Sequence, residues 1–169
     1  MTIAITIAIT IEVDVQYGDD LSDAQCAGIP TSQKIVTWVE AALTGLRTEA
    51  QLTVRIVSSE ESAALNQLYR HKQGPTNVLS FAVDDADNLP VPLLGDIVIC
   101  APIIEREAHE QHKKAVAHWA HMVVHGTLHL LGYDHMNDTQ AQEMESLETQ
   151  ALAGLGFPDP YCEEPSRIK

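Results

Sequence analysis

Residues 125–135 read His-Gly-Thr-Leu-His-Leu-Leu-Gly-Tyr-Asp-His, and this stretch decides how the rest of the chain is organised. His125 and His129 are four residues apart, which on a helix places both imidazoles on one face, one turn apart. Gly132 predicts the end of that helix, because glycine readily takes the left-handed conformation that follows a last turn. The chain can then fold back and return His135 toward the first two histidines.

Three imidazoles with an open fourth position are typical of a catalytic zinc site, so we expect His125, His129 and His135 to bind one zinc ion per chain. Their spacing resembles the HExxHxxGxxH zinc helix of metzincins. The glutamate that serves metzincins as the general base is replaced here by Gly126. The stretch therefore predicts a metal centre that lacks the base of peptide hydrolysis. Nickel and manganese stay open as alternatives to zinc.

The longer stretch 118–135 resembles the signature of the YbeY family. Two further segments carry the same resemblance: Tyr69-Arg70 followed by Pro-Thr-Asn-Val-Leu-Ser-Phe at 75–81, and Leu-Gly-Asp-Ile-Val-Ile at 94–99. Together they cover roughly residues 50–160, in three ordered motifs. The resemblance implies a bacterial metallo-endoribonuclease of single-stranded RNA that acts in 16S rRNA 3′-end maturation and ribosome quality control. It also implies ribosomal protein uS11 and the GTPase Era as partners.

Two more residues are candidates for catalysis. A guanidinium binds phosphate through two hydrogen bonds and stabilises charge that develops in phosphoryl transfer. In the family the arginine of the matching Tyr-Arg pair is functional, so we expect that role for Arg70. Asp134 is open to two interpretations: it orients an imidazole or acts as a base in place of the missing glutamate, or it is a turn residue after Gly132.

The composition is that of a globular protein with a core, and the length predicts a single catalytic domain over 1–169. The formal net charge of −14 disfavours broad, non-specific binding to nucleic acid, which leaves a local basic patch to meet RNA phosphate. Three widely spaced cysteines imply no disulfide framework, which fits a reducing cytoplasm. No segment reaches membrane-spanning length, and the N-terminus lacks the basic region of a signal peptide.

Residues 1–15 predict a strand, because Ile or Val occupies every odd position from Ile3 to Val15. The remaining patterns predict strands over 51–57, 77–83 and 95–100 and helices over 31–46, 59–69, 102–111, 115–131 and 139–153. We expect a polar loop over 19–30 and a loosely structured tail over 154–169. The helix over 59–69 is expected to begin with a capping box of Ser58 and Glu61 and to bury a face of Ala64, Leu65 and Leu68.

This order of elements predicts an α+β fold, a single layered domain in which a mixed sheet of roughly four strands packs with helices around a central metal-binding helix. Two other functions stay open beside the zinc-dependent endoribonuclease. One is a metallopeptidase or other metal hydrolase. The other is a non-catalytic ribosome-assembly factor with structural zinc, whose acidic surface would complement a basic ribosomal protein.

Overall fold

Four strands form one mixed sheet in the order β1-β2-β4-β3. The structure, a computed structural model, describes residues 8–84 and 88–161. Neighbouring strands are parallel from β1 to β4, and β3 pairs antiparallel with β4 at the edge. The strands are β1 (Thr10–Tyr17), β2 (Glu49–Val57), β3 (Val78–Ala82) and β4 (Leu93–Cys100). The predicted α+β fold with a four-stranded mixed sheet is therefore confirmed.

Strand β4 lies inside the sheet, between β2 and β3, a position for which its apolar run Ile97–Ile99 is typical. In register with it, Val54 and Ile56 of β2 pair with Ile97 and Ile99, and all four side chains are fully buried. The N-terminal strand begins later than expected, at Thr10, and residues 1–7 of the predicted strand lie outside the described residues. Within β1 the odd positions Ile11, Val13 and Val15 are half-buried and the even positions are exposed, so the period of two is present from Thr10 to Gln16, while Tyr17 at the end of the strand is exposed.

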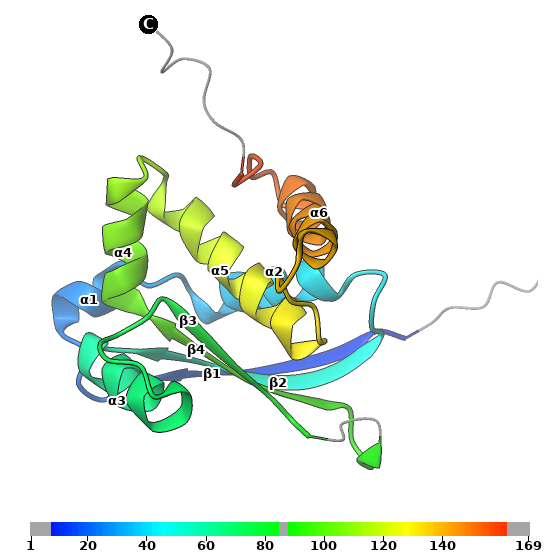
Figure 1. Cartoon of the computed structure of the whole chain (residues 1–169), viewed down its shortest axis with the longest axis horizontal. Helices are drawn as coiled ribbons and strands as arrows, with labels where there is room; N and C mark the ends of the chain where they lie inside the picture. Colours follow the sequence, from blue (N-terminus) through cyan, green and yellow to red (C-terminus); the bar gives the residue numbers. More distant parts are fainter. Residues whose placement is uncertain (1–7, 85–87, 162–169) are drawn as a thin grey trace, which may run out of the picture.

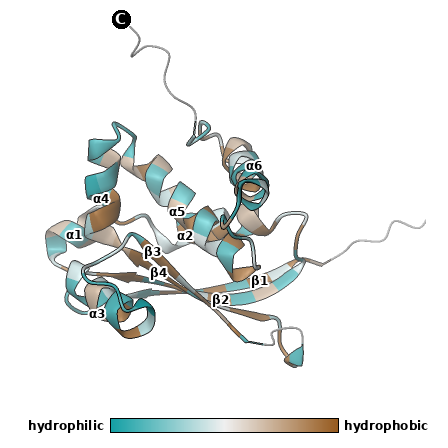
Figure 2. Ribbon diagram, viewed as in Figure 1, coloured by the Kyte–Doolittle hydropathy of each residue, from teal (hydrophilic) through white to brown (hydrophobic). Residues whose placement is uncertain are grey.

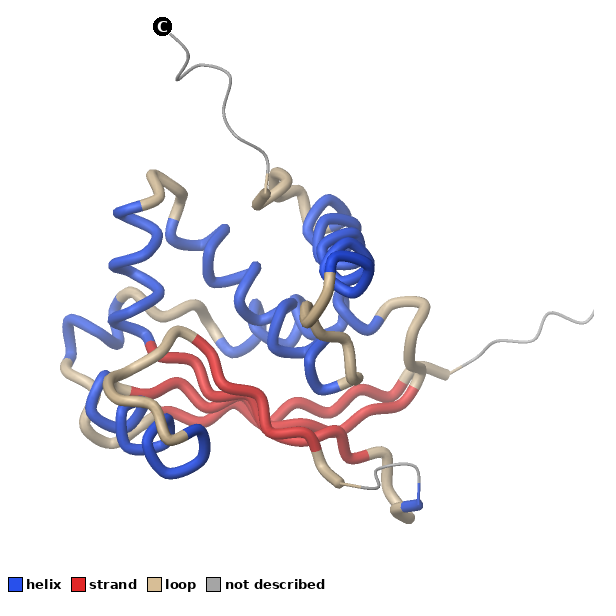
Figure 3. Tube along the Cα trace, viewed as in Figure 1, coloured by secondary structure: helices blue, strands red, loops and turns tan. Residues whose placement is uncertain are grey.

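Helices cover the two faces of the sheet unequally (Figure 1, Figure 3). Helix α3 (Ser59–Arg70) lies on one face, while the other carries α2 (Ser32–Leu43), α5 (Ala115–Leu130) and α6 (Asp138–Gly154). The larger core lies between the sheet and α2, α5 and α6, and includes Trp38, Val123 and Met144. Hydrophobic residues line the central strands, while the outer faces of the helices are hydrophilic (Figure 2). Helix α5 contacts helices on either side as well as β3 and β4, so it occupies the predicted central position.

Several predicted helix ends are confirmed by their capping hydrogen bonds. The side chains of Thr31, Ser58 and Asn137 accept from backbone N–H groups at the starts of α2, α3 and α6. Pro102 lies in the first turn of α4 (Ala101–Glu110), where a missing N–H costs nothing. Among residues 8–84 and 88–161, none of the helices combines the length and the hydropathy needed to cross a membrane.

Residues 19–30 were expected to form a loop, but they contain a short helix, α1 (Asp23–Ala27). Ser22 accepts from the backbone N–H of Gln25, and the Gln25 side chain accepts from the backbone N–H of Ser22. This reciprocal pair satisfies two donors that the first turn of a helix leaves without partners. At α3 the expected capping box is only half present, because the Glu61 carboxylate pairs with Arg55 of β2 at 2.6 and 3.0 Å.

The predicted buried face of α3 was wrong. Ala64 is exposed, Leu65 is half-buried and Leu68 is 64% exposed, whereas Ser62 and Asn66 are buried. The reason is the loop that follows the helix: Ser62 Oγ bonds both the N–H and the carbonyl oxygen of Thr76, and Asn66 donates to the carbonyl oxygen of Gly74. A helix face that holds a loop through its backbone has to be polar, and apolar periodicity cannot reveal it.

The segment after α6 packs against the domain over its described part, 155–161. Phe157 lies edge-on to Trp38 of α2, with ring centroids 6.2 Å apart, and Lys113 donates to the carbonyl oxygen of Pro160. Tyr161 is exposed, but its hydroxyl donates to the buried carboxylate of Glu148. The rest of the predicted loose tail, 162–169, lies outside the described residues, as does Cys162.

Candidate metal centre

Helix α5 ends in a reversal that brings His135 back toward the helix. Gly132 has a φ of +99°, its N–H donates to the carbonyl oxygen of His129, and the N–H of Tyr133 donates to that of Leu128. This pair of hydrogen bonds with a left-handed glycine is a Schellman motif, which satisfies two carbonyl groups that a helix end leaves free. The turn expected from Gly132 is therefore present, and its geometry is set by the backbone.

The imidazoles of His125, His129 and His135 converge at this end of α5. The Nε2 atoms of His125 and His129 are 3.1 Å apart, and the ring of His135 lies 5.9 and 5.4 Å from the other two rings. One nitrogen from each of the three residues lies within 4.8 Å of the others. Two ligands of a tetrahedral zinc ion at the usual Zn–N distance are about 3.3 Å apart. The donor set and the spacing of the three histidines thus fit a metal ion.

The protonation of the group also fits metal binding. Burial lowers the pKa of His129 below its ordinary value, and the neighbouring imidazoles of His125 and His135 lower it further. A lowered pKa keeps the imidazole neutral near pH 7, which is the form that ligates a metal. His125 and His129 are half-buried and His135 is exposed, so the group can be reached from solvent.

The buried carboxylate of Glu148 in α6 contacts the Nδ1 side of His125, opposite to the nitrogen that faces His129, and the sequence analysis missed it. Its Oε1 is 3.2 Å from Nδ1 of His125, its Oε2 contacts Nε2 of His121, and Oε2 also accepts from the Tyr161 hydroxyl at 2.8 Å. Glu148 is 1% exposed. Burial by itself would raise the pKa of Glu148, but the hydrogen bonds from His121 and His125 outweigh it and lower that pKa to about 2. The carboxylate is therefore ionised.

A sequence signal for Glu148 did exist. It lies four residues after Met144 and four before Leu152, so it falls on the apolar stripe of α6. A charged residue on a buried stripe is rarely tolerated without partners, and this one has them in α5. The partners are far away in sequence, which is why the stripe alone could not name them.

Four other histidines of the chain divide into a buried and an exposed pair. His121 is buried and bound to Glu148, and His118 is buried with its Nε2 2.9 Å from Oε1 of Glu107 in α4. His109 and His112 are exposed. The buried side chains of His118 and His121 thus connect α5 to its neighbours α4 and α6.

Asp134 lies in the turn between the second and third histidines and is half-buried. Its Oδ1 accepts a hydrogen bond of 2.8 Å from the backbone N–H of His135. Its charge acts on His129, whose pKa it raises against the larger effect of burial. This position is compatible with both expected roles of Asp134, as a turn residue and as a carboxylate beside the three histidines.

Arg70 is exposed and is the last residue of α3. Helix α3 lies on the face of the sheet opposite to α5 (Figure 1). Arg70 forms no ion pair with any residue of 8–84 or 88–161. The edge strand β3 lies between Arg70 and helix α5. On one side of β3, Tyr69 packs edge-on against Phe81, and on the other side the Ser80 hydroxyl donates a hydrogen bond to α5. The structure therefore places Arg70 around the sheet edge from the three histidines and not in contact with them.

Gly126, which stands where metzincins have their catalytic glutamate, faces the sheet. A Cβ atom there would lie 2.8 Å from Cγ2 of Ile97 and 3.2 Å from Cγ2 of Val78. Both distances are shorter than ordinary contacts between side chains, so the helix approaches the sheet closely at this position. A carboxylate at position 126 would have no room without a shift of α5.

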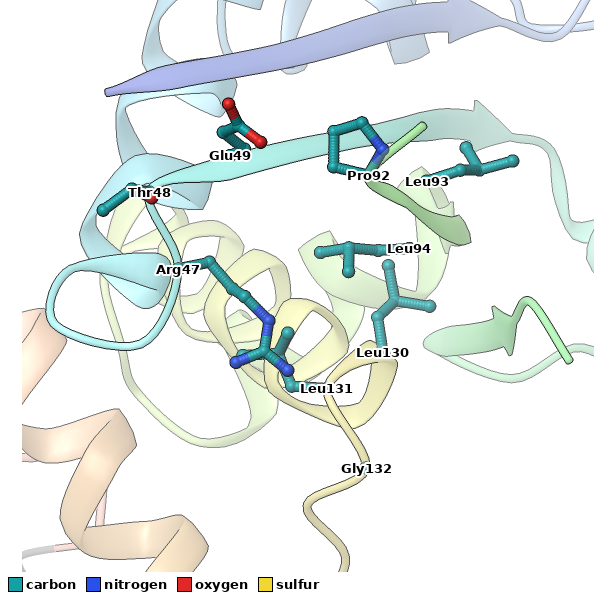
Figure 4. Close-up of a pocket in the computed structure, with 9 residues that line it drawn as sticks. All are labelled: Arg47, Thr48, Glu49, Pro92, Leu93, Leu94, Leu130, Leu131 and Gly132. Carbon is teal, nitrogen blue, oxygen red and sulfur yellow. The ribbon is translucent and has the colours of Figure 1, made fainter. Parts of the chain in front are cut away.

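A cleft of about 440 Å³ borders the end of the metal helix, between β2, β4 and the turn after α5. Leu130, Leu131 and Gly132 form one wall, and Arg47 extends its guanidinium toward Leu131 (Figure 4). Arg47 also donates to the carbonyl oxygen of Leu46 at 2.8 Å. The surface at the C-terminal end of α5 is thus concave, and it carries both a cation, Arg47, and a carboxylate, Glu49.

Two comparisons with known proteins identify the fold and the family of the chain. The solution structure of TM1509 from Thermotoga maritima superposes with a TM-score of 0.55 at 22% identity, covering 91% of this chain and 100% of that one. That likeness shows a shared fold. Residues 21–156, which include α5 and the turn to His135, match the family model described as Endoribonuclease YbeY. Because this match spans most of the sequence, the chain belongs to the YbeY family of endoribonucleases, enzymes of rRNA processing.

Proposed function

We propose that the chain is a zinc-dependent endoribonuclease that cleaves single-stranded RNA, with one ion held by His125, His129 and His135. The observation that carries the proposal is the convergence of these three imidazoles at the reversal after α5. When bound, the ion supplies a Lewis acid that polarises a phosphoryl oxygen and makes water a better nucleophile. Zinc is proposed before nickel or manganese because three neutral nitrogen donors with an open position suit it.

Arg70 binds the substrate phosphate in this proposal. The segment 62–83 around it contains Arg70 and Lys72 but no Asp or Glu, in a chain of net charge −14. A local region without carboxylates lets RNA approach a protein whose surface elsewhere repels it. The fork of the guanidinium matches two phosphate oxygens, and Arg70 has no ion pair to give up among the described residues.

Asp134 is the proposed proton acceptor. Its Oδ1 is fixed by the N–H of His135, while Oδ2 has no partner among residues 8–84 and 88–161. A carboxylate oriented in this way, beside the ligands, can take a proton from the attacking water or from an RNA 2′-hydroxyl. The two attack modes differ in their products, because the 2′-hydroxyl leaves a cyclic phosphate.

The cellular role that fits this chemistry is 16S rRNA 3′-end maturation and late ribosome quality control in the cytoplasm. Ribosomal protein uS11 and the GTPase Era are the proposed protein partners, as the family resemblance implies. The acidic surface of the chain favours a basic partner such as a ribosomal protein. Peptide hydrolysis is disfavoured, because position 126 faces Ile97 and Val78 and offers no room for the base of a metzincin.

The test is RNA cleavage by the purified chain with its metal content quantified. Wild type, His129→Ala, Arg70→Ala and Arg106→Ala are each given a single-stranded RNA, the same RNA as a duplex, and a peptide. Arg106 is the matched control, because it is an exposed arginine on α4 whose nearest carboxylate is Glu110, on its own helix.

We expect wild type and Arg106→Ala to cut the single strand only. His129→Ala should lose both the metal and the activity. Arg70→Ala should keep the metal and lose roughly 10- to 100-fold in rate, as expected for the loss of a charge-assisted hydrogen bond to the substrate phosphate. Metal-loaded wild type that leaves RNA intact would contradict the nuclease proposal. In that case peptide cleavage would support the metal-hydrolase alternative, and inactivity on both substrates would support the assembly factor.

A further inference from the structure

Glu148 joins α6 to α5 through a buried network of hydrogen bonds. Its two oxygens receive three groups: Nδ1 of His125 on Oε1, and Nε2 of His121 together with the Tyr161 hydroxyl on Oε2. A carboxylate that is 1% exposed is costly to bury unless its oxygens are satisfied. The network meets that need with donors from two other segments of the chain.

The contact with His125 defines where that imidazole carries its proton. An ionised carboxylate only accepts hydrogen bonds, so the nitrogen that faces it, Nδ1, must be the donor. In a neutral imidazole the other nitrogen, Nε2, then presents a lone pair. That Nε2 is the atom that lies 3.1 Å from Nε2 of His129, on the side where the three rings converge.

The contacts of His121 also indicate a neutral imidazole whose proton lies on the nitrogen that faces Glu148. Its Nε2 faces Oε2 of Glu148, while its Nδ1 is buried and has no partner within the described part of the chain. A neutral ring with its proton on Nε2 donates to the carboxylate and leaves only an acceptor unpaired at Nδ1. An imidazolium would instead leave a buried donor without a partner, which costs more.

We infer that Glu148 is a positioning residue of the metal centre: it holds the proton on Nδ1 of His125 and thereby aims the Nε2 lone pair at the ion. This inference rests on the proposed metal site, and it adds a residue from α6 that is no ligand itself. Carboxylates that accept from the second nitrogen of a ligand histidine fix its ring and increase its basicity. Here the carboxylate also ties α6 to α5, so metal binding and the packing of α6 become coupled.

A second possible metal site overlaps this network and has to be distinguished from it. His121, His125 and Glu148 also offer ligand atoms within 4.8 Å of one another, so they could hold an ion of their own. In that case Glu148 would be a ligand, and His125 would coordinate through Nδ1. The number of ions per chain and the protonated nitrogen of His125 separate the two arrangements.

The first experiment needs no variant. Long-range ¹H–¹⁵N NMR on the full wild-type chain, with and without zinc, identifies which nitrogen of His125 carries the proton. We expect Nδ1–H in both states, coordination through Nε2 in the zinc form, and one zinc ion per chain. Coordination through Nδ1, or two ions per chain, would overturn the inference.

The second experiment compares zinc affinity by competition with a chromophoric chelator in wild type, Glu148→Gln and Glu145→Gln. Glutamine has one acceptor oxygen where the carboxylate has two, so it cannot accept from both His121 and His125. We expect the zinc dissociation constant of Glu148→Gln to rise by roughly 10- to 100-fold, with still one ion at saturation. Glu145→Gln, an exposed residue on the same helix, removes the same charge and should leave the affinity unchanged.

Unchanged zinc affinity in a folded Glu148→Gln chain would contradict the inference. If that variant fails to fold, the NMR result on wild type still decides. A wild type that binds no zinc would refute both this inference and the proposed function. A wild type that binds zinc through Nε2 of His125 but cuts no RNA would refute only the nuclease.

Discussion

The hydroxyl of Ser80 donates a hydrogen bond of 3.0 Å to the carbonyl oxygen of Gly126, so the edge strand β3 is bound to the metal helix one residue after His125. The bond forms at a position where α5 has no side chain and lies close to the sheet. A backbone carbonyl inside a helix already accepts one intrahelical bond, and its second lone pair can take this one. The position of His125 therefore depends on how closely α5 and β3 pack.

Gly126→Ala should destabilise the protein by about 1–3 kcal/mol, the usual cost of an added methyl group in a packed core. The new Cβ would press on Ile97 and Val78, and this outweighs the better helix propensity of alanine. Gly154→Ala on α6 is the control, because a Cβ there meets nothing within 4 Å. Urea denaturation measures both, and equal stability changes in the two variants would refute the close-packing explanation.

Zinc should raise the thermal stability of the chain. At a free zinc concentration about 100 times the dissociation constant, binding to the native state adds about 2.7 kcal/mol. For a protein of this size that corresponds to a rise in Tm of roughly 5–10 °C. Calorimetry with chelator and with zinc measures the shift.

The same scan on His129→Ala should show no zinc-dependent shift, because one of the three converging imidazoles is missing. His109→Ala is the matched control, since His109 is exposed and lies on α4. A zinc-induced rise in Tm for His129→Ala as large as in wild type would place the ion elsewhere.

Acid should destabilise the metal-free chain through His118. Burial lowers the pKa of His118, and its contact with Glu107 opposes that effect only in part. The unfolded chain, in which this imidazole has its ordinary pKa of 6.5, therefore takes up the proton first as the pH falls. The free energy of unfolding is constant with respect to this group above that value and decreases below it.

His118→Gln keeps an N–H donor near Glu107 but cannot titrate. Its unfolding free energy should fall less steeply than that of wild type between about pH 7 and pH 5. Denaturation at several pH values with chelator present measures the two slopes. Parallel curves for wild type and His118→Gln would show that His118 does not contribute to the pH dependence of stability. The control is His109→Gln, whose curve should run parallel to that of wild type because His109 is exposed.

Ser62→Ala should loosen the loop next to Arg70. Ser62 is 1% exposed, and its hydroxyl satisfies both the N–H and the carbonyl oxygen of Thr76. Buried backbone groups left without partners cost about 1–3 kcal/mol. Hydrogen exchange at Thr76 should become faster, and the unfolding free energy should fall by that amount. Ser146→Ala, at an exposed position of α6, should change stability by less than about 0.5 kcal/mol.

Much of the fold follows from local patterns. Strand β4, the starts of α2 and α6, and helix α5 with its stop at Gly132 were each expected from residues close together in sequence. Such features depend on the 3.6-residue period of a helix, the two-residue period of a strand and the freedom of glycine at positive φ. The approach of His125, His129 and His135 is likewise contained in residues 125–135. Their role as metal ligands stays a prediction.

Tertiary structure alone decided what surrounds those histidines. It placed Glu148 behind His125, turned the Ser62 and Asn66 face of α3 toward its own loop, and set Arg70 on the other side of β3. Each of these arrangements pairs polar groups that lie on different elements, and their geometry exists only once the layers pack. The sequence by itself determined the helix, its stop and the spacing of three imidazoles, because backbone geometry is local. The partner of a buried charge is not local, since burial and hydrogen bonding are created when distant segments meet.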